Sequence, residues 1–165
     1  MAVYSLKAVQ KIPASLSEVW AVFSTPANLH RITPEEMKFK TISAPTNEKI
    51  HKGQVIEYRV SPLMGIPLYW MTEITVVEAE TFFIDEQRKG PYALWRHQHF
   101  FKEIEGGVEM TDLIHYKNPL WVLGDLANAL FIKRKLRQLF EYRFYKVEEI
   151  FDKWHELQFP NIQLL

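Results

Sequence analysis

Two histidines stand two residues apart in a segment whose residue types are typical of a β-strand. The segment 93–104 follows a Gly-Pro turn signal and contains His97 and His99. Because successive side chains of a strand point to opposite faces, both imidazoles are expected on the face that also carries Trp95 and Phe101. The opposite face carries arginine, glutamine and lysine, and it suits contact with water. A face of rings with no fixed charge among them indicates a lined cavity rather than a plain hydrocarbon core.

The two imidazoles could serve more than one kind of chemistry. A pair at this spacing could bind a metal ion, with Asp85 or Asp112 of a neighbouring strand as a third ligand. The sequence contains no cysteine, and no third and fourth ligand is evident from spacing. Histidines that line a pocket wall, hydrogen-bonded to neighbours or to a ligand, are therefore the favoured interpretation. Neither a metal site nor a cofactor is predicted.

Asp112 is the carboxylate most relevant to these histidines. Alternation puts it on one face with Met110, Ile114 and Tyr116, where an unpaired carboxylate would be costly to bury. If it points inward, it is expected to pair with a histidine of the preceding strand across the tight turn at Gly106-Gly107. Such a pair could support acid–base chemistry, and a structural buried pair is the favoured alternative.

Further polar and aromatic side chains are expected at the same cavity. Asp85 and Gln87 share a face with Phe83 shortly before the Gly-Pro turn, and they could equally hold the head group of a ligand or support the turn. Several aromatic side chains are candidates for the cavity wall, although most such rings are simply core. The predicted ligand-binding residues are Tyr58, Trp70, Asp85, Gln87, Trp95, His97, His99, Asp112 and Tyr116.

Hydrophobic period and turn residues divide the chain into strands and helices. Ser15 and Glu18 have the spacing of a capping box, which predicts a short helix, and Thr25-Pro26 predicts a second short helix through Ile32. Strands are predicted at 3–12, 37–44, 54–60, 67–77, 81–89, 93–104 and 108–117, and a long helix at 121–154. Residues 159–165 are expected to be an ordered loop or a frayed end.

Two side-chain patterns follow from these elements. Alternation in the strand 67–77 puts one set on a common face: Trp70, Thr72, Ile74 and Val76. The long helix has a predicted apolar stripe at Leu123, Leu126, Leu130, Leu139, Phe140, Phe144, Val147, Phe151 and Trp154. Its basic residues are interpreted as a solvated face: Lys133, Arg134, Lys135, Arg137 and Arg143.

The order of these elements predicts a single α+β domain over residues 1–165. A curved, seven-stranded antiparallel sheet must bury one face, and the long C-terminal helix is the element long enough to cover it. Two short helices follow the first strand. A twisted sheet wrapped around a helix tends to leave a pocket between the two, which is where small ligands usually bind.

Composition limits the expected partners and location. The 165 residues are 47% hydrophobic and carry no net charge, so binding to nucleic acid is not expected. The first residues lack the pattern of a signal peptide, and no apolar run approaches the ~18 residues that span a bilayer. With no cysteine for disulfide bonds, the expectation is a cytoplasmic protein without stable membrane insertion. The oligomeric state is not predicted.

Several motifs resemble one protein superfamily. They are Pro26-Ala27-Asn28-Leu29 with Thr33-Pro34; Phe83-Ile84-Asp85-Glu86-Gln87 with Gly90-Pro91-Tyr92 and Trp95-Arg96-His97-Gln98-His99-Phe100; Met110-Thr111-Asp112 with Tyr116 and Pro119; and Leu139-Phe140-Glu141-Tyr142-Arg143. In motifs and in element order the chain resembles the START and SRPBCC superfamily, and within it a bacterial polyketide cyclase/dehydrase-like group. The resemblance covers nearly the whole chain. It implies the helix-grip fold and a hydrophobic ligand cavity, and it implies no particular reaction.

Three functions are consistent with these observations. The favoured one is binding of a hydrophobic or amphipathic small molecule, such as a lipid, a quinone or an aromatic metabolite. The alternative is a cyclase, dehydratase or isomerase in which His97 or His99 acts as acid or base and Asp112 tunes it. A module that reports ligand binding to a protein partner is the third. No residue is predicted to be catalytic if the first function holds.

Overall fold

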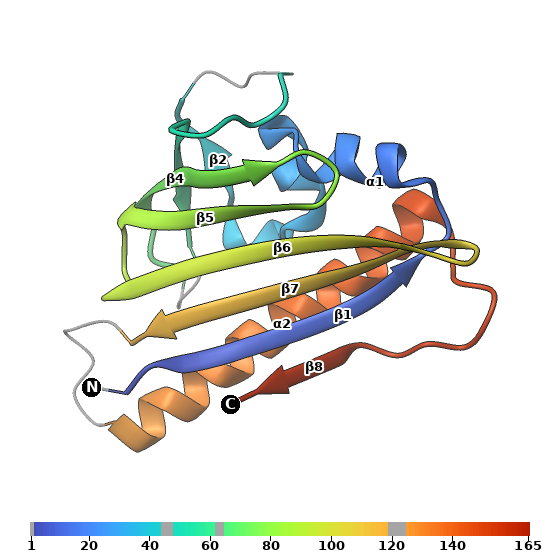
Figure 1. Cartoon of the computed structure of the whole chain (residues 1–165). Coiled ribbons are helices and arrows are strands. Elements are labelled where there is room, and N and C mark those ends of the chain that lie inside the picture. Colours follow the sequence, from blue (N-terminus) through green and yellow to red (C-terminus); the bar gives the residue numbers. More distant parts are fainter. Residues whose placement is uncertain (1, 44–47, 62–64, 119–124) are drawn as a thin grey trace.

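The computed structural model describes residues 2–43, 48–61, 65–118 and 125–165, and it shows an antiparallel sheet that curves around a long helix (Figure 1). The predicted α+β arrangement is confirmed. The helix α2 (Asp125–Phe151) lies along the concave side of the sheet, and the short helices follow the first strand. The inward faces of the strands therefore point toward α2.

Within the described residues the sheet has eight strands, so the predicted count of seven was wrong. They are β1 (Tyr4–Ile12), β2 (Lys40–Thr41), β3 (Val55–Val60), β4 (Leu68–Glu78), β5 (Phe82–Lys89), β6 (Leu94–Ile104), β7 (Gly107–Lys117) and β8 (Asn161–Leu164). Their order in the sheet is β2-β3-β4-β5-β6-β7-β1-β8. The strands from β3 to β7 are therefore neighbours in sequence order, which is the predicted meander.

The eighth strand is the segment predicted to be a loop or a frayed end. β8 pairs with the outer edge of β1, and the backbone of Ser5 and Leu165 exchanges two hydrogen bonds of 2.9 Å. Ile162 is the buried side chain of this short strand. Four residues that follow a proline are too few to show a recognisable alternation of apolar and polar side chains. Formation of β8 therefore depends on the free edge of β1, which exists only in the folded sheet.

The second strand is much shorter than the predicted range 37–44. Residues Glu35–Met37 form a short 3₁₀ helix, η2, and Lys38 has a left-handed backbone conformation with φ of 46°. A positive φ cannot belong to a strand, so pairing begins only at Lys40. Residue 44 lies outside the described residues.

The two short helices begin at the predicted positions, but only the first has its predicted side-chain cap. In α1 (Leu16–Phe23) the Ser15 hydroxyl accepts from the Glu18 backbone at 3.4 Å, and the Glu18 carboxylate accepts from the Ser15 backbone at 2.9 Å. The second helix, η1 (Pro26–Ile32), is a 3₁₀ helix. Its Thr25 hydroxyl donates backward to the Ala21 carbonyl at 2.7 Å and so does not cap η1.

The long helix departs from its predicted side-chain pattern at three places. Leu130 is 63% exposed, so its place in the apolar stripe was wrong. Trp154 is buried but lies beyond the helix, which ends at Phe151 before the left-handed Asp152. Arg143 is only 9% exposed and does not belong to a solvated basic face. The predicted start at 121, Leu123 and the side chain of Leu126 lie outside the described part of the structure.

A β-bulge corrects the predicted face of β4. The register against β5 shifts between Ile74 and Val76, so Val76 is exposed while Val77 packs against the core. Trp70, Thr72 and Ile74 are buried as expected. A bulge inserts one residue and reverses the faces beyond it, which a regular period of two cannot anticipate.

Gly107, at the start of β7, sits against another backbone. A Cβ placed there would lie 2.0 Å from the Ile12 carbonyl oxygen, whereas one at Gly106 would have 3.4 Å to the Trp154 ring. We expect Gly107→Ala to lower the free energy of unfolding by about 1–3 kcal/mol, because β1 must move away. Urea denaturation would measure this. Gly106→Ala introduces strain only through its positive φ, and it is expected to lower the free energy of unfolding by about 1 kcal/mol. An equal loss of stability in the two variants would contradict the steric explanation.

Candidate functional site

A cavity of about 770 Å³ lies between the concave face of the sheet, α2 and the η1–η2 segment. Its wall is largely aromatic and aliphatic, with a polar group of side chains on β4, β5 and β6. Lining residues include Tyr58, Trp70, Thr72, Asp85, Trp95, His97, His99, Leu139 and Arg143. The cavity therefore combines an apolar body with one polar region, where the histidines lie.

Strand register brings the polar group together. Asp85 of β5 faces His97 of β6 as a paired residue, and His99 of β6 faces Asp112 of β7. All four side chains are on the inner face, because directly paired residues of neighbouring strands share a face and His97 and His99 are two residues apart. The two histidines thus lie between two carboxylates that come from the strands on either side.

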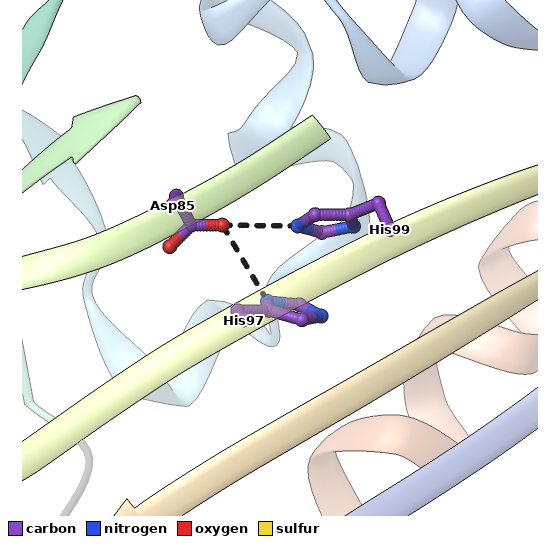
Figure 2. Close-up of side chains that lie close together, drawn as sticks. All are labelled: Asp85, His97 and His99. Carbon is purple, nitrogen blue, oxygen red and sulfur yellow. Dashed lines mark hydrogen bonds and ion pairs between the residues drawn. The ribbon is translucent and has the colours of Figure 1, made fainter. Parts of the chain in front are cut away.

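The distances within this group are short. Asp112 Oδ1 is 2.8 Å from His97 Nε2 and 2.9 Å from His99 Nδ1, although only the first contact has hydrogen-bond geometry. Asp85 Oδ2 is 3.0 Å from His99 Nε2 and 3.8 Å from His97 Nδ1 (Figure 2). Each carboxylate therefore contacts both imidazoles, and the predicted pairing of Asp112 with a histidine of the preceding strand is present.

Packing fixes the orientation of both rings. The centroids of His97 and His99 are 3.7 Å apart, and Phe83 stacks on His99 at 4.0 Å. Phe140 of α2 meets His97 edge to face at 6.0 Å. Rings held in this way have little rotational freedom, so the positions of their nitrogen atoms are set by the fold.

The environment shifts the pKa values of the two imidazoles in opposite directions. Burial lowers the pKa of His97, and the charge of His99 lowers it further against the pull of Asp112. Burial also acts to lower the pKa of His99, but its contacts with Asp112 and Asp85 outweigh burial and raise it. An added proton therefore favours His99 over His97, and a second is disfavoured because two charged rings at this distance would repel each other.

The two carboxylates remain ionised. Burial alone would raise the pKa of Asp112, but its close contacts with both histidines lower it far below its ordinary value. Asp85 behaves similarly, with burial opposed by the His99 hydrogen bond and the charge of His97, and the net effect lowers its pKa. Thr72 also donates to Asp85 Oδ1 at 3.1 Å.

Arg143 is a candidate-site residue that the sequence interpretation missed. Its guanidinium lies 4.8 Å from the Phe140 ring centroid, and burial lowers its pKa while Asp112 and Asp85 raise it in part. Its Nε has no hydrogen-bond partner among the described residues. The signal was available in the spacing, because Arg143 is three residues after Phe140 and four before Val147, both buried.

The predicted ligand-binding residues divide into two sets. Those that line the cavity are Tyr58, Trp70, Asp85, Trp95, His97 and His99. Asp112 lies behind the histidines, Tyr116 packs with Tyr4 and Tyr92, and Gln87 bonds to the Tyr92 backbone at 2.6 Å, which is the turn-supporting role. Thr72 and Tyr92 line the cavity although neither was among the predicted residues.

Among the described residues, no helix is both long enough and apolar enough to cross a membrane.

No protein-family model matches the sequence, and no curated protein does either. Solved structures do match. Protein Ms6760 from Mycobacterium smegmatis has a TM-score of 0.68 at 14% identity, over 92% of this chain and 93% of that one.

Two further structures show the range of the likeness. Ara h 8.0201 has a TM-score of 0.58 at 12% identity, over 90% of this chain and 99% of that one. A nucleoside-diphosphate sugar epimerase from Corynebacterium glutamicum has a TM-score of 0.59 at 19% identity, over 87% of this chain but 28% of that longer chain. At these identities the likeness shows the fold alone. The chain has the START-like helix-grip fold.

Proposed function

We propose that this protein binds a hydrophobic or amphipathic small molecule in the cavity between sheet and α2. The single observation that carries the proposal is a cavity of about 770 Å³ with an apolar, aromatic wall and one polar region. Its volume lies within the roughly 300–1,000 Å³ of small-molecule sites, and a few convergent polar groups in an apolar pocket are what such sites use for orientation.

The wall supports a ligand with a flat or chain-like apolar body. Trp70 lies at 5.9 Å from Tyr58 in a stacked arrangement and at 5.3 Å from Trp95, edge to face. The polar end offers Arg143, His99 and the Tyr58 hydroxyl, whose pKa is raised mainly by burial. A lipid, a quinone or an aromatic metabolite with one oxygen-bearing head group fits this division.

A cavity-filling substitution tests the proposal. Leu139→Trp introduces a large side chain from α2 into the cavity wall, and we expect it to weaken binding of a hydrophobic fluorescent probe at least about tenfold, or 1.4 kcal/mol. Leu130→Trp is the matched control, since Leu130 is on the same helix and exposed. Native mass spectrometry of detergent-free protein would identify any co-purified ligand. The proposal fails if the unmodified protein binds no probe, or if both variants bind alike.

The second candidate is an enzyme of the cyclase, dehydratase or isomerase type. The observation that favours it is that both imidazoles line the cavity and each has a carboxylate within contact distance. Turnover of compounds from a metabolite library, lost in His97→Ala and retained in His115→Ala, would support it. Wild-type and His97→Ala proteins that are equally inactive toward ligands shown to bind would exclude it.

A further inference from the structure

Three donor side chains converge at the polar end of the cavity. One donor atom from each of Asp85, His97 and His99 lies within 4.8 Å of the other two, and Figure 2 shows the three groups pointing toward one another. Asp85 Oδ2 is 3.0 Å from His99 Nε2 and 3.8 Å from His97 Nδ1. Ligands of a tetrahedral ion with bonds near 2.0–2.1 Å are separated by about 3.3 Å, so these two distances lie within about 0.5 Å of that separation.

Asp112 selects which nitrogen of each ring is free to coordinate. It contacts His97 Nε2 and His99 Nδ1, which are the nitrogens on the far side of each ring from Asp85. A neutral imidazole whose N–H faces this carboxylate has its lone pair on the other nitrogen. A metal ion that displaces the proton of the hydrogen bond between His99 Nε2 and Asp85 Oδ2, which passes to solvent, would meet lone pairs on both His97 Nδ1 and His99 Nε2. A carboxylate behind a ligating histidine is the usual outer-shell support of metal sites.

Thr72 orients the third donor, the carboxylate of Asp85. Its hydroxyl donates to Asp85 Oδ1 at 3.1 Å, so Oδ2 is the oxygen left facing the histidines. With Phe83 and Phe140 packed on the rings, every donor is oriented by a neighbour on a strand or on α2. Little rearrangement is therefore needed for the three donors to bind one ion.

Charge also favours a cation here. Within the part of the chain that the structure describes, the fixed charges of this group are the carboxylates of Asp85 and Asp112 and the guanidinium of Arg143. They sum to one negative charge in a buried place, which a bound cation would offset. Two imidazoles and one carboxylate are ligands that suit first-row transition metals better than Mg²⁺ or Ca²⁺.

We propose that Asp85, His97 and His99 form a binding site for a divalent transition-metal cation, with Asp112 as the outer-shell carboxylate. Spacing alone favoured a metal-free pocket wall, because it could not show that the two aspartates lie on opposite sides of the ring pair. Three protein ligands leave at least one coordination position, and since all three residues line the cavity, that position faces the cavity. The site does not depend on the organic ligand proposed above.

Zinc titration tests this site directly. Tag-free protein, stripped with a chelator, would be titrated with Zn²⁺ by calorimetry, and with Co²⁺ while its visible absorption is recorded. We expect one ion per chain and a Co²⁺ spectrum that indicates nitrogen and oxygen ligands. Asp112→Asn is expected to weaken Zn²⁺ binding about 10–100-fold, and Asp85→Asn and His99→Ala to weaken it further.

The control is His115→Ala, a histidine on β7 whose side chain is on the opposite face from Asp112. It should bind Zn²⁺ as the unmodified protein does, and circular dichroism would establish that each variant is folded. If His99→Ala does not fold, Asp85→Asn, which keeps the side-chain shape, carries the test. Absence of Zn²⁺ binding in the unmodified protein, or equal binding in Asp85→Asn, would overturn the proposal. Either result leaves the probe-binding test of the cavity unaffected.

Discussion

Replacing Asp112 with alanine is expected to lower the free energy of unfolding by about 3–5 kcal/mol. Asp112 is 6% exposed and touches both imidazoles, at 2.8 and 2.9 Å. Without it, the buried Arg143 guanidinium and the two imidazoles are left with Asp85 as the remaining carboxylate of this group. Removing one partner of a buried ionic group leaves a charge whose desolvation is no longer offset. Urea denaturation at neutral pH, with no added metal, measures the loss.

Two further variants separate the charge of Asp112 from its strand position. Asp112→Asn keeps a hydrogen-bond acceptor for His97 and should lose less stability than Asp112→Ala. Glu109→Ala lies on the same strand and on the outward face, and its effect should stay within about 0.5 kcal/mol. If Asp112→Ala cost no more than Glu109→Ala, the ionic group would contribute nothing to folding.

The second large effect is expected from Phe83→Ala, at about 3–5 kcal/mol. Phe83 is buried, stacks on His99 at 4.0 Å and meets Trp20 edge to face at 5.9 Å. Its removal leaves a cavity between α1 and the sheet and frees one side of the His99 ring. Thermal or urea denaturation measures the stability. Zn²⁺ affinity, measured at a temperature where the variant is folded, should fall as well.

Phe82 provides the matched control, because it is the neighbouring phenylalanine with its side chain on the other face of β5. It is only partly buried and pairs with Phe100 across the strands at 5.8 Å. Phe82→Ala is expected to cost about 1 kcal/mol, the upper range of a cross-strand pair, and to leave Zn²⁺ affinity unchanged. Similar losses in the two variants would contradict the assignment of Phe83 to the support of His99.

Features that depend on near neighbours in sequence were predictable. The Ser15 cap needs only Glu18 three residues later, and the common face of His97 and His99 follows from the period of two. Asp112 was expected to pair because a lone carboxylate between apolar residues is costly to bury. Each of these inferences uses a rule that acts over a few residues, and the surrounding fold did not overturn it.

Features that depend on distant partners were not predictable. The bulge after Ile74 and the left-handed Lys38 change which residues face the core, and no local residue type marks either. Asp85 and Asp112 are on different strands, so only the register shows that they enclose the histidines. Arg143 is a different case. Its position in the apolar period of α2 predicts burial, whereas its charge predicts exposure. It is buried because two carboxylates on the sheet, Asp85 and Asp112, offset its charge.

The position of β1 between β7 and β8 has a consequence for the protein during its synthesis. A ribosome that adds about 5–20 residues per second needs roughly 5 to 20 seconds between completing β1 and beginning β7, its first sheet partner. For that time the backbone donors and acceptors of β1 lack the strands with which they pair in the folded sheet. Of the described strands, the one made first is therefore among the last to enter the sheet. Its unpaired backbone is a site where a chaperone that binds nascent chains would prevent aggregation.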